Sequence, residues 1–378
     1  MELVPIAAAG LLAQVAPRYL DARTNILLGS VLGALIAGYF IGRFLRRQPE
    51  STASPAVVHT FNLRVRAWWM MTAILIGGFL LGYEATIILF GLVSFWALRE
   101  FITMTPTRRG DHRILFWTFF AFTPAQYIFV AMGWYNLYTI MIPVYASLLV
   151  PSRIAIWGDP KRFLERAAKI QAGLLICVYA LSHAPALLHL DLQTSDGNPW
   201  YISTTAAEQA APPPGDAAAG KAAEAPALRA ASVPPPPAAA IPGSRAGLLF
   251  YFVLIVQLND VFQYAWGRLL GKKIIAPLIS TSRTWEGFIG GILSTMLVGM
   301  LLCWATPFKA WEAACIAGVV AFMGSLGSLT MSAIKRDRGV KDYGTLVSGH
   351  AGVLDRIDSL CFAAPVFFHI TRYFFSGP

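Results

Sequence analysis

Long apolar stretches alternate with short polar loops along almost the whole chain. About 20 apolar residues are needed to cross the hydrocarbon core of a bilayer as a helix. Inside lipid, a helix satisfies its own backbone N–H and C=O groups, which an irregular segment cannot do. The pattern therefore predicts an all-α integral membrane protein, a polytopic helical bundle of about ten transmembrane helices at 24–42, 67–82, 85–100, 114–131, 135–151, 170–188, 246–264, 287–305, 312–333 and 356–374.

Composition and charge support this prediction and add an orientation. Of the 378 residues, 56% are hydrophobic and 13% are charged, whereas a soluble protein carries about a quarter charged residues. The net charge of +10 is unevenly spread, because one set of loops holds 21 Lys and Arg residues and the opposite set holds 6. Basic loops stay in the cytoplasm, so the charge requires no nucleic-acid partner and predicts a multi-pass protein of the inner (plasma) membrane. The basic set consists of 43–66, 101–113, 152–169, 265–286 and 334–355.

One segment differs in composition from the rest of the chain. Residues 190–245 are rich in Ala and Pro, including the run AAPPPGDAAAGKAAEAP. Such sequence buries no core and is typical of an extended linker. It predicts three parts: an N-terminal membrane part of about six spans (1–189), a disordered non-cytoplasmic linker (190–245), and a C-terminal catalytic membrane part of about four spans (246–378).

The polar segment 332–358, SAIKRDRGVKDYGTLVSGHAGVLDRID, concentrates residues suited to phosphate chemistry. Its cations can bind phosphate oxygens, and its carboxylates are hard ligands of the kind that Mg²⁺ prefers. Asp355 and Asp358 share one face of a helix if the last span begins here, and carboxylates running into an apolar span are usually functional. The N-terminus of that helix is also predicted to favour a phosphate.

A second polar segment, 259–291, borders the seventh and eighth predicted spans. Asp260 follows Asn259 inside the end of an apolar stretch, and this pair suits either metal or substrate contact or polar packing between helices. Arg268, Lys272 and Arg283 are candidate phosphate contacts. Glu286 is interpreted as structural, closing the loop onto the following helix.

Together these segments resemble the phosphatidate cytidylyltransferase (CDP-diglyceride synthetase) family. The family signature has an S-x-x-K-R element, a K-D pair and an H-G-G followed by x-x-D-R-x-D, and the charged positions match in this sequence. Ala351 replaces the first glycine after the histidine, and Ser348 replaces a usual proline. The residues that match are Ser332, Lys335, Arg336, Lys341, Asp342, His350, Gly352, Asp355, Arg356 and Asp358.

The resemblance implies that the protein transfers the cytidylyl group of CTP to phosphatidate, giving CDP-diacylglycerol and pyrophosphate on the cytoplasmic side. It implies catalytic roles for Asp342, Lys341, His350 and Asp355. It implies a metal site for Mg²⁺, with room for a second divalent or monovalent ion, formed by Asp260, Asp342, Asp355 and Asp358. The residues expected to bind substrate are Lys335, Arg336, Arg356, Arg268, Lys272, Arg283 and Ser332.

Several alternatives remain open from the sequence. A CTP-dependent lipid kinase of the polyprenol or phytol type would handle phosphates in a similar way but would release CDP. A non-enzymatic transporter would place its binding site near the middle of the membrane instead. His350 could act as a base, form a hydrogen bond to phosphate or be structural, and a homodimer is one assembly that the sequence allows.

Overall fold

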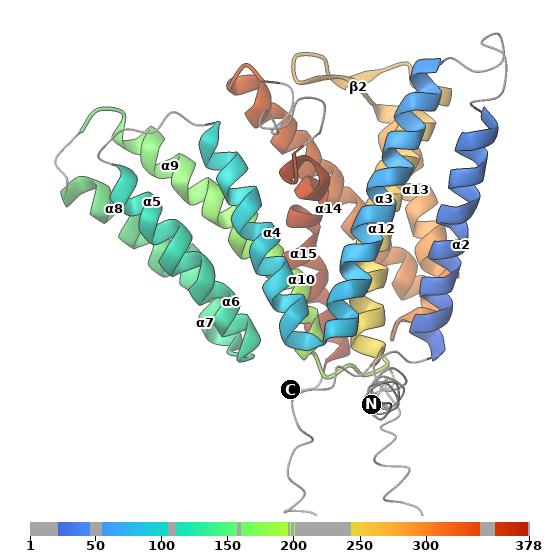
Figure 1. Ribbon diagram of the computed structural model, residues 1–378, viewed down its shortest axis with the longest axis horizontal. Coiled ribbons are helices and arrows are strands. Elements are labelled where there is room, and N and C mark those ends of the chain that lie inside the picture. The colour runs from blue at the N-terminus through green and yellow to red at the C-terminus, as the bar shows by residue number, and fades with distance from the viewer. Residues whose placement is uncertain are drawn as a thin grey trace, which may run out of the picture.

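The computed structural model describes residues 22–45, 55–104, 111–156, 160–195, 197, 200, 243–340 and 352–376. In this part of the chain almost every element is a helix, and the long helices run between two opposite faces of one bundle (Figure 1). The principal helices are α2 (Ala22–Leu45), α3 (Pro55–Leu81), α4 (Tyr83–Thr103), α5 (His112–Trp117), α6 (Thr123–Ala131), α7 (Tyr135–Ile140), α8 (Ser147–Ile156), α9 (Phe163–Gly173), α10 (Leu181–Ala186), α12 (Gly243–Leu269), α13 (Trp285–Leu301), α14 (Ala310–Asp337) and α15 (Leu354–Phe375).

The predicted all-α membrane bundle is confirmed. Seven helical segments are long and apolar enough to cross a membrane, and Trp68–Leu81 and Trp285–Leu301 are shorter apolar helices. Three predicted spans contain a wide π turn between two α-helical halves, so each span carries two helix labels. These turns are η3 (Thr118–Phe122), η4 (Met141–Ala146) and η5 (Leu174–Ala180), and short 3₁₀ turns follow at η6 (Leu187–His189) and η7 (Cys303–Ala305).

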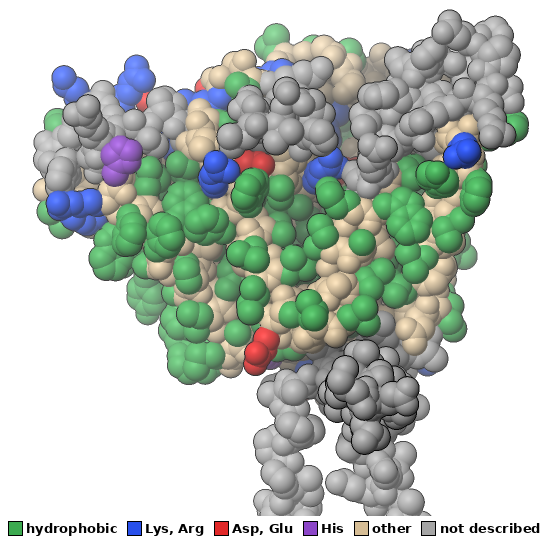
Figure 2. Space-filling model, viewed as in Figure 1, with side chains coloured by type: hydrophobic (Ala, Val, Ile, Leu, Met, Phe, Trp, Pro, Cys, Tyr) green, Lys and Arg blue, Asp and Glu red, His purple; other side chains and the backbone are tan. Residues whose placement is uncertain are grey.

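The two faces of the bundle differ in character. The ends of α12 and α14, the start of α15 and the hairpin between α12 and α13 share one face, which we call the motif face (Figure 1). Hydrophobic side chains cover the middle of the bundle, whereas most visible Lys and Arg side chains lie near the motif face (Figure 2). This arrangement agrees with the basic loops sharing one side. Which compartment that side faces stays a prediction.

A short antiparallel hairpin is the exception to the helical architecture. Strand β1 (Ile274–Ala276) pairs with β2 (Ser280–Thr284), with Ile274 opposite Thr284. The Glu286 carboxylate accepts backbone N–H groups of Lys272 and Lys273 at 3.1–3.3 Å. This confirms the structural role predicted for Glu286, which holds the hairpin against the first turn of α13.

The beginning of the predicted linker is folded against the face opposite the motifs. Leu192 forms an antiparallel bridge with Ser376, and the N–H of Gln193 donates to the carbonyl of Phe375 at 2.8 Å. Leu190 and Leu192 are buried. The prediction that the linker begins at 190 is therefore wrong for these first residues, because their apolar side chains find a core to pack against. Residues 201–242 lie outside the described residues.

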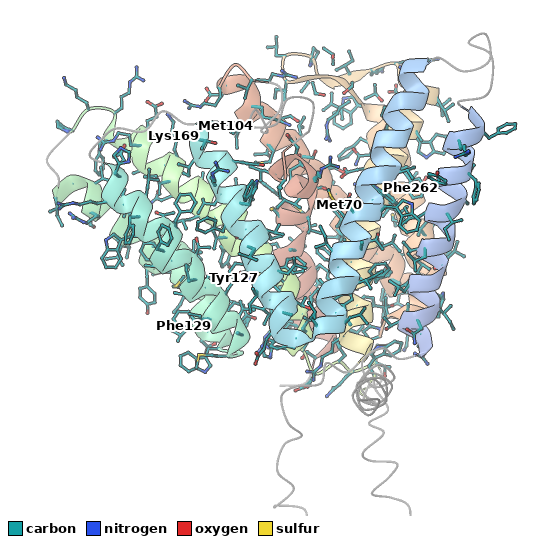
Figure 3. All side chains as sticks on the ribbon, in the orientation of Figure 1. Met70, Met104, Tyr127, Phe129, Lys169 and Phe262 are labelled. Carbon is teal, nitrogen blue, oxygen red and sulfur yellow. The ribbon has the colours of Figure 1, made fainter. Side chains whose placement is uncertain are left out.

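The N-terminal helices pack around aromatic and small residues. Tyr127 of α6 lies inside the bundle (Figure 3), and its ring stands 3.4 Å from the position that a Cβ on Gly91 of α4 would occupy. Helix α10 packs against α15, and α4 packs against both. The N-terminal and C-terminal parts therefore share one continuous core rather than forming separate units.

Helices α12 and α13 approach closely where glycines face each other. A Cβ on Gly287 would lie 2.7 Å from the carbonyl oxygen of Gln263 and 3.0 Å from the Cα of Gly267. We expect Gly287→Ala to destabilise the protein by about 1–3 kcal/mol, because backbone atoms cannot move aside as a flexible side chain can. Thermal unfolding in detergent measures the change. Gly77→Ala is the matched control, since nothing lies within 4 Å of its added Cβ; equal stability of the two variants would contradict the expectation.

Candidate active site

Two carboxylates from distant parts of the chain meet at the motif face. Ser359 of α15 joins them: its hydroxyl donates to Asp260 Oδ2 of α12 at 2.8 Å, and its N–H donates to Asp358 Oδ1 at 2.7 Å. Asp358 is only 6% exposed, and the charges of Asp260 and Asp358 are close enough to act on each other. The structure therefore brings together the two acidic segments that the sequence singled out.

Asp358 is also connected to a cation from the hairpin. Ser328 of α14 donates its hydroxyl to Asp358 Oδ2 at 3.1 Å, and Arg283 of β2 donates to the same Ser328 oxygen. Arg283 thus reaches Asp358 through Ser328, and Lys335 is a further described cation near Asp358. Four elements (α12, β2, α14 and α15) thus contribute to one cluster of opposite charges, which we call the acid cluster: Asp260, Arg283, Ser328, Lys335, Asp355, Asp358 and Ser359.

Lys335 and Asp355 form an ion pair at the edge of this cluster. Lys335 Nζ lies 2.7 Å from Asp355 Oδ1, and the two side chains are 13% and 9% exposed. The N–H of Gly352 donates to Asp355 Oδ2 at 3.3 Å. Asp355 therefore faces protein, and the pair joins α14 to α15. A metal-ligand or catalytic role for Asp355, and a substrate contact for Lys335, stay predictions.

The remaining predicted substrate contacts are spread around the motif face. Arg336 donates to the carbonyl of Ile279 in the hairpin turn at 3.1 Å, so it links α14 to the hairpin. Ser332 donates its hydroxyl to the carbonyl of Ser328 within its own helix at 2.8 Å. Arg268 and Lys272 are exposed beyond the acid cluster, and Arg356 is half-buried in the first turn of α15.

Three of the predicted catalytic residues belong to the segment between α14 and α15. Lys341, Asp342 and His350 lie outside the described residues, as do Ser348 and Ala351. The segment that holds them is bounded by Val340 after α14 and by Gly352 before α15. Their roles stay predictions.

Asn259 forms hydrogen bonds between helices. Its side chain is fully buried, and its Nδ2 donates to the carbonyl of Ala321 and to Ser325 Oγ, both at 3.1 Å. Thr295 of α13 lies 3.5 Å from its Oδ1. Of the two interpretations left open for the Asn259–Asp260 pair, polar packing between helices therefore describes Asn259, while Asp260 points to α15.

A carboxylate from another helix binds two N–H groups at the N-terminus of α15. Glu100 of α4 accepts the N–H of Val353 at 3.0 Å and that of Leu354 at 2.8 Å. The predicted phosphate site at this helix start is therefore wrong, since an internal carboxylate occupies it. Sequence reasoning missed Glu100; the available signal was a lone acidic residue at the end of an apolar span.

The chemistry of the carboxylates suits a hard cation. Asp260 and Asp358 are neighbouring carboxyl groups in a largely buried site, and a bound cation would offset the repulsion between their charged forms. Among the described residues, however, no three His, Cys, Asp or Glu side chains are grouped closely enough to form a metal site on their own. Mg²⁺ commonly uses one or two carboxylates together with substrate phosphates, and Asp260 and Asp358 fit that lesser requirement.

Comparison with known proteins identifies the family. The model of the cytidylyltransferase family matches residues 62–374, which is most of the chain. The chain belongs to the cytidylyltransferase family. Membership makes it a nucleotidyltransferase, and the acid cluster lies within the matched region.

Individual relatives of this cytidylyltransferase differ in how much of it they cover. The uncharacterized protein YnbB of Escherichia coli (strain K12) is 31% identical over 351 residues, covering 92% of this chain and 97% of YnbB. The phosphatidate cytidylyltransferase of Staphylococcus saprophyticus is 40% identical over 121 residues, and that of Staphylococcus haemolyticus is 38% identical over 120 residues. These two matches span 32% and 31% of this chain and 46% of either relative.

Proposed function

We propose that this cytidylyltransferase transfers the cytidylyl group of CTP to phosphatidate, releasing pyrophosphate and forming CDP-diacylglycerol. The observation that carries the proposal is the convergence of Asp260 and Asp358 on Ser359, beside Arg283 and Lys335. The names of the staphylococcal relatives supply the substrate. A site at the ends of membrane helices also suits a reaction between a soluble triphosphate and a lipid phosphate.

In this reaction a phosphatidate oxygen forms a bond to the α-phosphorus of CTP, and the bond from that phosphorus to the bridging oxygen of pyrophosphate breaks. The attacking phosphate is already an anion, so the protein needs to position it and to shield charge rather than to remove a proton. Arg283 and Lys335 supply positive charge next to the carboxylates. No nucleophilic side chain is required, because the lipid phosphate attacks directly.

We propose that Asp260 and Asp358 hold Mg²⁺, with Asp342 as a further ligand and Asp355 near enough in sequence to join them. When bound, the ion would offset charge on the triphosphate and on the departing pyrophosphate. Ser359 and Ser328 orient the two carboxylates through the hydrogen bonds described above. Arg268, Lys272 and Arg336 lie farther out at the motif face, where they would attract anionic substrates.

The proposal is tested with purified protein, CTP radiolabelled in the cytidine, and phosphatidate in detergent micelles. We expect label to enter lipid and pyrophosphate to be released in equal amounts, with both signals lost when phosphatidate or Mg²⁺ is omitted. Release of CDP with phosphorylation of a lipid alcohol would show a lipid kinase instead. Absence of CTP-dependent transfer to any acidic lipid would contradict the proposed function.

A further inference from the structure

Glu100 is a largely buried carboxylate at the end of α4, far along the chain from the acid cluster. Its side chain is 7% exposed. One oxygen accepts the N–H of Val353 at 3.0 Å and the indole N–H of Trp96 at 3.1 Å, and the other accepts the N–H of Leu354 at 2.8 Å. The two backbone contacts hold the carboxylate against the start of α15, and the indole of Trp96, one turn away on α4, orients it.

The start of α15 lacks the usual capping side chain. Val353 occupies the N-cap position and makes no side-chain hydrogen bond to the helix, since its isopropyl group has no acceptor. The first N–H groups of a helix have no partner within it, and the helix dipole favours a negative charge there. Glu100, on a different helix and more than 250 residues earlier in the chain, supplies both the hydrogen-bond acceptors and the negative charge.

Two hydrogen bonds to consecutive amides fix both the position of a helix along its axis and its rotation about that axis. An α-helix turns about 100° and rises about 1.5 Å with each residue. If α15 slipped by one residue, Asp355 would leave Lys335 and Asp358 would leave Ser328. The contacts of Glu100 therefore bear directly on where the carboxylates of α15 point.

We propose that Glu100 is a positioning residue of the transferase site: it sets the register of α15 so that Asp355 and Asp358 face their partners on α12 and α14. This inference rests on the proposed function for its catalytic consequence, but not for its structural content. Glu100 itself contacts no substrate in this proposal. It acts through the two amides of α15.

The test compares Glu100→Gln with wild type in the full-length protein. Gln has the same size, but its NH₂ group would face a backbone N–H and cannot accept from it. We expect kcat for cytidylyl transfer to fall about 100-fold, as for other small displacements of catalytic groups, with the KM for CTP unchanged. Amide hydrogen exchange should rise in the peptide covering 352–358 and stay the same in α2 and α13.

Two further variants keep the test decisive. Glu84→Gln makes the same change at an exposed position of α4 and should alter neither exchange nor kcat. Trp96→Phe removes only the indole N–H from Glu100, and it should raise exchange at 352–358 less than Glu100→Gln does. It therefore serves as the milder variant should Glu100→Gln not fold.

The outcomes separate the two proposals. Unchanged exchange at 352–358 in Glu100→Gln, or a uniform rise over all helices, would overturn the positioning role. A drop in kcat accompanied by a matching rise in KM would also overturn it, because that pattern would indicate direct contact with CTP. If wild type transfers nothing to phosphatidate, the proposed function fails, whereas the exchange comparison still supports or overturns the placement of α15 by Glu100.

Discussion

Replacing Asp358 with Asn is expected to lower kcat by about 1,000-fold, since a bound cation that offsets phosphate charge contributes several kcal/mol to the transition state. Asn keeps the shape of the side chain and can still accept the N–H of Ser359, so the local packing survives. What it removes is a carboxylate oxygen that could bind a cation beside Asp260. Steady-state kinetics of label transfer from CTP to lipid measure the loss.

The control for this prediction is Asp337→Asn, which makes the same change at an exposed residue near the end of α14, paired with Arg338 at 2.8 Å. It should retain full activity and the thermal midpoint of wild type. Asp342→Asn should match the loss at Asp358 if the segment 341–351 contributes to the same site. Near-normal turnover in Asp358→Asn would remove this residue from the proposed metal site.

Asp111→Ala is expected to have the largest effect on stability, about 3 kcal/mol, because it leaves a buried guanidinium without its principal counter-charge. Arg166 of α9 donates through Nε to both oxygens of Asp111, at 2.9 and 3.1 Å. The side chains of Asp111 and Arg166 are 2% and 5% exposed, respectively. The pair ties the start of α5 to α9. Thermal unfolding in detergent, followed by circular dichroism, measures the change.

Two controls distinguish loss of this pair from a general effect of substitution. Glu165→Ala breaks an ion pair with Lys169 on the same helix, but Glu165 is 41% exposed, so we expect no measurable shift. The double variant Asp111→Leu/Arg166→Met removes both charges and should recover much of the loss. A single variant as stable as wild type would show that the pair does not support the fold.

Much of the fold follows from hydropathy alone. Ten apolar stretches became helical segments, because a chain in lipid has few other ways to satisfy its backbone. The proximity of Asp260 and Asp358 was also predictable. Carboxylates within membrane spans face the interior of the bundle rather than lipid, and both residues lie toward the same side of the membrane. The resemblance to the family, which the match over residues 62–374 confirms, rested on a signature that contains Asp358.

The details that were missed depend on contacts between distant segments. Nothing local to residues 352–354 indicates that Glu100 would cap them, and the N-terminus of α15 was instead assigned to a phosphate. Leu192 was assigned to a linker because the Ala/Pro-rich composition that follows it dominates the segment. In both cases a buried partner from elsewhere in the chain decided the outcome, and periodicity carries no information about such partners.

The bridge between Leu192 and Ser376 has a mechanical consequence. Glu100 holds one end of α15, and residues 192–193 hold the other end through Ser376 and the carbonyl of Phe375. A piston-like shift of α15 along its axis would have to break both attachments at once. Helix α15 is thus attached at both ends to residues that lie far away in the sequence.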